Sequence, residues 1–110
     1  LAFLSGEVET LFKRISPDRV GVEKIFFSKN VKTALDVAQA KGVVLSVVAG
    51  RGADVFEIAP TSVKAAIAGD GHAEKAAVAK MLRLLLDIKT KGMLDDVTDA
   101  LAVAVAVSGL

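Results

Sequence analysis

Apolar side chains recur at helical spacing through the first fifteen residues. They are Leu4, Val8, Leu11, Phe12 and Ile15. Pro17 ends this predicted helix, because a proline pushes the residue before it out of the helical region. At 20–27 the pattern changes to a nearly continuous apolar run, VGVEKIFF. Such a run is typical of a short strand that is buried on both faces in a parallel sheet.

The same kind of pattern predicts four further elements before residue 90. They are a helix over roughly 30–49, a strand at 55–58, a helix at 60–68 and a helix at 73–87. Ser28 could cap the first of these helices, and Gly50 and Gly52 would end it. A polar loop at 89–94 follows the last of them.

The final segment has two patterns that disagree. Val and Leu alternate with Ala over 101–107, and a period of two favours a strand. Alanine is, however, the best helix former, and Asp95 offers an N-cap for a helix. We therefore predict a helix here, buried nearly all round.

The order of helix, strand, helix, strand and further helices indicates an α/β fold with two parallel strands and about five helices. At 110 residues the chain is long enough for one domain, taken as 1–110. Two parallel strands make a poor sheet by themselves, so a further strand is expected beside the one at 20–27.

Composition narrows the class of protein. The absence of cysteine excludes disulfides and thiolate metal sites, and fits a cytoplasmic protein. A formal charge of +1 gives no global basic field, so any contact with nucleic acid depends on locally placed cations. The longest charge-free run, at 100–110, is shorter than the roughly 20 residues of a membrane-spanning helix, so no membrane association is predicted.

Three acids are the main candidates for chemistry. Glu23 lies near the carboxyl end of its strand, where open α/β sheets bind ligands. Asp96 and Asp99 are three apart, which places both on one face of a helix. Three converging carboxylates would suit Mg²⁺, a hard cation that takes oxygen ligands. Alternatively, Glu23 faces solvent or pairs with Lys24, and the aspartates only favour the positive end of a helix dipole.

Other polar and aromatic residues give weaker signals. One of Phe26 and Phe27 is expected to pack inward, and the other could stack on an unpaired base. Several lysines follow strands, and each taken singly is more simply a solvated residue than a phosphate ligand. They are Lys29, Lys32, Lys64 and Lys75. His72 is the only histidine, so no His-based triad or zinc site can be built, and Glu57 is interpreted as structural.

Five ordered blocks closely resemble the RuvC family of Holliday-junction resolvases, which have an RNase H-like fold. The resemblance runs from roughly Leu4 to Ser108. The blocks are VEKIFFSKN at 22–30, ALDVAQAKGV at 34–43, VFEIAPTSVK at 55–64, GDGHAEK at 69–75 and DVTDALA at 96–102. Five blocks in order and at family spacing are much more specific than any one of them.

The resemblance implies that Glu23, Asp96 and Asp99 are three of four acids that hold two divalent ions, Mg²⁺ or alternatively Mn²⁺. Asp95 is a rival to Asp96, but anchoring the last block on Asp99 selects Asp96. The resemblance also assigns DNA-binding roles to four residues, with the aromatic one probing an opened base and two of the lysines near the scissile phosphate. They are Phe26, Lys29, Lys64 and Lys75.

The resemblance further implies a homodimer that acts on four-way junction DNA during recombination and repair, with a branch-migration helicase complex as a partner. Family members begin with a strand that carries the first acid in an Ile-Asp-Pro-Gly-like motif, and this chain has no such segment. We therefore expect a chain without its N-terminal strands that is inactive by itself. The alternative is a noncatalytic RNase H-like module that binds branched nucleic acid or a protein partner.

Overall fold

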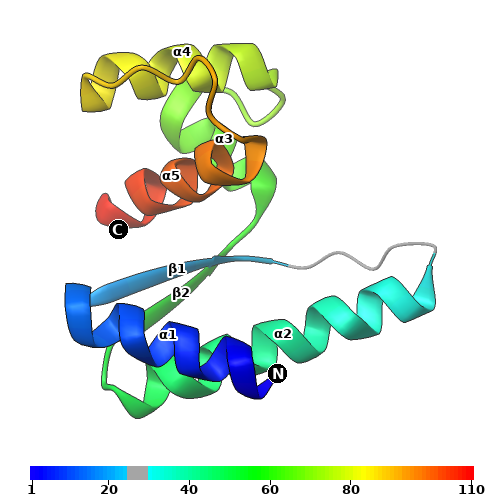
Figure 1. Cartoon of the computed structure of the whole chain (residues 1–110). Helices are drawn as coiled ribbons and strands as arrows, with labels where there is room; N and C mark the ends of the chain where they lie inside the picture. Colours follow the sequence, from blue (N-terminus) through cyan, green and yellow to red (C-terminus); the bar gives the residue numbers. More distant parts are fainter. Residues whose placement is uncertain (25–29) are drawn as a thin grey trace. The chain divides into compact units, whose positions relative to one another are not determined.

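The structure is a computed structural model that describes residues 1–24 and 30–110. Its elements follow one another in the predicted order (Figure 1). They are α1 (Ala2–Ile15), β1 (Arg19–Glu23), α2 (Val31–Gly50), β2 (Asp54–Ile58), α3 (Pro60–Ala68), α4 (Lys75–Leu86) and α5 (Asp95–Ser108). The predicted strand at 20–27 can be compared only as far as residue 24, because 25–29 lie outside the described residues.

The two strands pair as a two-stranded parallel sheet. At one end the backbone N–H of Asp54 donates to the carbonyl of Asp18, and at the other the N–H of Lys24 donates to the carbonyl of Ile58, both at 2.9 Å. Residue numbers rise together along the pair, so the strands run in the same direction. Their carboxyl ends, with Glu23 on β1, therefore lie at the same edge.

The chain divides into two compact units. The first holds α1, α2 and the beginning of both strands, and the second holds Gly21–Lys24 together with Glu57–Leu110. The second unit contains Glu23 and all of α3, α4 and α5, so the candidate acids lie within one unit. The single domain expected over 1–110 stays a prediction.

In the first unit, α1 packs against α2. Helix α1 ends as predicted before Pro17, with Ser16 in the left-handed region at a φ of 50°. Helix α2 begins after Asn30, whose side-chain oxygen accepts a hydrogen bond from the N–H of Thr33 at 3.3 Å. Asn30 is therefore the cap of α2, and the prediction of Ser28 is wrong, because the helix begins later than the pattern indicated; Ser28 itself lies outside the described residues.

By length and composition alone, the twenty-residue helix α2 is long and apolar enough to cross a membrane. The prediction that no stretch could span a bilayer is therefore too strict. It relied on charge-free runs, whereas α2 is apolar overall despite isolated charges such as Asp36 and Lys41. Helix length and composition alone are weak evidence for a membrane span.

The second unit has an apolar core built from β2, α3, α4 and α5. Its buried residues are Ile58, Val63, Ile67, Val78, Leu82, Ala102, Ala106 and Val107. The final segment is a helix, as predicted, because small Ala102 and Ala106 recur four apart on one face and allow close packing. It is not buried all round, since its first turn and Ala104 are exposed.

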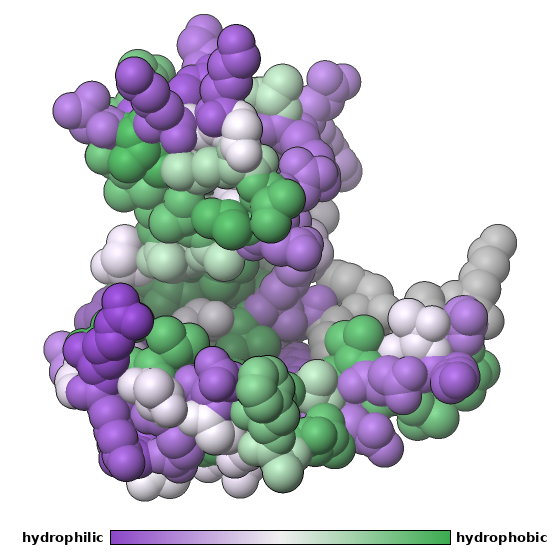
Figure 2. All heavy atoms as spheres, in the orientation of Figure 1, coloured by the Kyte–Doolittle hydropathy of each residue, from purple (hydrophilic) through white to green (hydrophobic). Residues whose placement is uncertain are grey.

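On the face drawn in Figure 2, hydrophilic residues gather over α4 and hydrophobic ones lie toward α5.

Helix α5 approaches β1 so closely that the strand needs a glycine at the contact. A Cβ atom added to Gly21 would lie 2.5 Å from Cγ2 of Val107 and 2.7 Å from Cγ1 of Val103. Separations under 3 Å are not tolerated without movement. Gly21 thus sets the distance between the strand that carries Glu23 and the helix that carries the aspartates.

Candidate functional site

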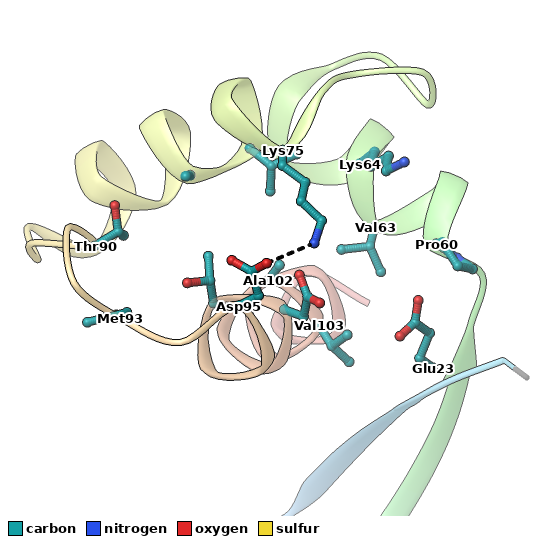
Figure 3. Close-up of a pocket in the computed structure, with 14 residues that line it drawn as sticks. Glu23, Pro60, Val63, Lys64, Lys75, Thr90, Met93, Asp95, Ala102 and Val103 are labelled. Atoms are coloured by element: carbon teal, nitrogen blue, oxygen red, sulfur yellow. Dashed lines mark hydrogen bonds and ion pairs between the residues drawn. The ribbon is translucent and has the colours of Figure 1, made fainter. Parts of the chain in front are cut away.

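A cavity of about 340 Å³ lies within the second unit (Figure 3). Its wall comes from the end of β1, from α3, α4 and α5, and from the loop before α5. The lining residues are Glu23, Pro60, Val63, Lys64, Lys75, Val78, Ala79, Thr90, Met93, Asp95, Thr98, Asp99, Ala102 and Val103. Both apolar and charged side chains line the cavity.

Three carboxylates line this cavity: Glu23, Asp95 and Asp99. Glu23 is the last residue of β1 and points from the strand toward the cavity (Figure 3). Asp95 and Asp99 are four apart on α5, so they share the helix face that Ala102 continues. Asp96, which the sequence selected, is exposed in the first turn of α5 and is not among the lining residues.

Asp95 is the first residue of α5 and not its cap, contrary to prediction. Leu94 occupies the N-cap position, and no side chain there accepts a hydrogen bond from the helix. The carboxylates of Asp95 and Asp96 still lie in the first turn, near the positive end of the helix dipole, which favours negative charge.

Two lysines bring positive charge to the same cavity. Nζ of Lys75 lies 3.4 Å from Oδ2 of Asp95, across the space between α4 and α5 (Figure 3). The two side chains are 73% and 82% exposed, so water screens this ion pair and it contributes little to stability. Lys64 on α3 also lines the cavity. A ligand in this cavity would therefore meet both carboxylates and ammonium groups.

The donor set fits a hard divalent cation, since carboxylate oxygens are the ligands that Mg²⁺ prefers. The positions of these oxygens, however, do not form a complete metal site. In residues 1–24 and 30–110, no three His, Cys, Asp or Glu side chains come close enough together to hold an ion. The acids share a cavity without meeting at one point.

Two residues predicted to bind DNA, Phe26 and Lys29, lie outside the described residues, so these roles stay predictions. Thr90 and Met93, which line the cavity, were missed. They lie in the predicted polar loop, and Thr90 stands between two lysines, which is a local pattern typical of solvated loops. No local signal could have identified these two residues.

The arrangement of helices on a parallel strand pair, with an acid at the end of β1 and further acids on α5, is that of an RNase H-like protein. A solved structure of T. thermophilus RuvC in complex with a Holliday junction substrate superimposes with a TM-score of 0.89 at 35% identity. The superposition covers 96% of this chain and 64% of the T. thermophilus chain. A second structure, of Thermus thermophilus RuvC, has a TM-score of 0.85, also at 35% identity, and covers 96% of this chain and 63% of that one. The expected fold is confirmed.

The family described as crossover junction endodeoxyribonuclease RuvC matches residues 1–107. The chain is 43% identical to the RuvC of Ruminiclostridium cellulolyticum and 47% identical to that of Moorella thermoacetica, each over 105 residues and 96% of the chain. The chain belongs to the RuvC family. It spans 63% of the length of both relatives.

Proposed function

We propose that the full protein is a divalent-metal-dependent endonuclease that resolves Holliday junctions by paired nicks. The observation that carries this proposal is the cavity that a RuvC-family chain forms between the end of β1 and α5, with acids and lysines among its lining residues. Roles in recombination and repair, a homodimeric state, a helicase partner and a cytoplasmic location belong to the same proposal.

In this proposal Glu23, Asp96 and Asp99 hold divalent ions, Mg²⁺ or Mn²⁺, with a fourth acid that the family pattern implies. Such ions would make a water nucleophilic and stabilise the leaving oxygen of the phosphodiester. Lys64 and Lys75 would neutralise the phosphate at the cavity rim, which makes DNA binding salt-dependent. In a two-fold dimer, each of two sites would cut one of two symmetry-related strands.

Asp95 has a different role in this proposal, because its carboxylate is already the partner of Lys75. A dication bound at Asp95 would lie a few ångströms from the lysine ammonium, and like charges at that distance repel. We therefore assign Asp95 to positioning Lys75, and keep Asp96 as the ligand.

A matched pair of substitutions tests this assignment. Asp96→Asn is expected to weaken Mn²⁺ binding by about tenfold or more, and Asp95→Asn to change it by less than about threefold. Binding is measured by electron paramagnetic resonance of free Mn²⁺. The reverse order of the two effects would transfer the ligand role to Asp95, the residue that lines the cavity.

The alternative function is a noncatalytic module that binds branched nucleic acid. It is favoured by the finding that the described part of the chain brings no three candidate ligands together. A labelled four-way junction separates the two functions. The nuclease is expected to give symmetric paired nicks with Mg²⁺, none with a chelator and none on linear duplex. Tight junction binding without nicks in Mg²⁺ or Mn²⁺ would favour the binding module instead.

A further inference from the structure

The loop that joins α4 to α5 is held to α4 by a side-chain hydrogen bond. Thr90 is the only buried polar residue in the described part of the chain, with 8% of its surface exposed. Its Oγ1 accepts a hydrogen bond from Nη1 of Arg83 at 2.9 Å. Arg83 stands in the last turn of α4, so the bond fastens the loop to the helix before it.

Two residues near Thr90, Asp87 before it and Gly92 after it, have positive φ angles. Asp87, which follows α4, is in the left-handed region at a φ of 51°, a conformation that few residues other than glycine adopt. Gly92 has a φ of 84°, and the N–H of Met93 donates to the carbonyl of Thr90 at 3.0 Å. These features are those of a type II turn with glycine at its third position. The turn leads directly into α5.

The first turn of α5 directly follows this loop. Its N-cap residue, Leu94, supplies no side-chain hydrogen bond, so the helix start is not fastened by a cap of its own. Thr90 and Met93 line the same cavity as Asp95 and come shortly before it in the chain. A shift of the loop would move the helix start with it.

We propose that the Arg83–Thr90 hydrogen bond positions the first turn of α5, and with it Asp95 at the cavity and Asp96 in the same turn. Arg83 and Thr90 are positioning residues that act through α5 and not by binding substrate or ion. The consequence for metal binding rests on the proposed function, whereas the position of the helix start does not.

Isosteric substitutions in the full protein test this proposal. Thr90→Val keeps the shape of the side chain and removes the hydroxyl, and Thr90→Ser keeps the hydroxyl. Thr90→Val is expected to speed amide hydrogen exchange over 91–98 and to raise the dissociation constant for Mn²⁺ about tenfold. Thr90→Ser is expected to stay close to wild type in both. Val48→Ala, at a buried position of the first unit, serves as the control for a general loss of stability.

The outcomes separate this inference from the proposed function. Unchanged exchange over 91–98 in Thr90→Val would overturn the inference. So would a Val48→Ala variant that weakens Mn²⁺ binding as much as Thr90→Val does, since the effect would then be general destabilisation. A wild-type protein that binds no Mn²⁺ would instead overturn the metal-dependent function, and faster exchange in Thr90→Val would still support the positioning of α5.

Discussion

Glu23→Gln is expected to abolish junction cleavage by the full protein and to remove most of its divalent-ion binding. Glutamine has the same shape as glutamate but no charge, and a neutral amide oxygen is a much weaker ligand for a hard dication. Because Glu23 is exposed at the end of β1, the fold should not change. Cleavage of a labelled four-way junction and titration with Mn²⁺ measure the two losses, and thermal unfolding checks the fold.

Glu57→Gln provides the matched control for this experiment. Glu57 is an exposed acid on the neighbouring strand β2, and it does not line the cavity. The same chemical change there should leave cleavage and Mn²⁺ binding close to wild type. If Glu23→Gln retained full Mn²⁺ affinity and cut junctions at the wild-type rate, the proposed site would be wrong.

Gly21→Ala is expected to lower the free energy of unfolding by about 1–3 kcal/mol, the usual effect of an overpacked contact. The added methyl group would overlap Val103 and Val107, so α5 must move away from β1 or the strand must bend. For a chain of this size each kcal/mol lowers the melting temperature by roughly 4–8 °C. Because α5 carries the aspartates, we also expect weaker Mn²⁺ binding than the stability loss alone would cause.

Gly42→Ala is the control for the same change of residue. Gly42 lies inside α2, and a Cβ atom there would meet nothing within 4 Å. Alanine is favoured over glycine in a helix, so this variant should be neutral or more stable by up to about 1 kcal/mol. Adding Val107→Ala to Gly21→Ala should recover part of the lost stability by making room. Equal melting temperatures for Gly21→Ala and wild type would contradict the close contact.

The local patterns of the chain predicted its elements well. Helical spacing, the proline at position 17 and the apolar run around Glu23 identified α1 and β1, because these signals depend on neighbours a few residues apart. Alanine at alternate positions correctly favoured a helix for α5 over a strand. The cap of α2 was missed, because Asn30 and Ser28 are equally suitable cap residues and only the start of the helix selects one.

The candidate site was predictable only in part. The sequence placed an acid at the end of a strand and aspartates at the start of a helix, and both positions are confirmed. It could not decide which aspartate lines the cavity. Successive helical residues differ by about 100° in direction, so a choice between Asp95 and Asp96 needs the orientation of α5 against α4. Their roles as metal ligands stay predictions.

The sequence by itself determined the order of helices and strands, the family and the residues that can carry chemistry, since these depend on residue type and on spacing along the chain. Only the tertiary structure decided that Lys75 pairs with Asp95, that Thr90 fastens the loop before α5, and that Gly21 lets α5 approach β1. Two of these contacts join elements far apart along the chain, and the third joins α4 to the loop after it. Packing in three dimensions sets such contacts, and no local pattern of hydrophobic and polar residues encodes them.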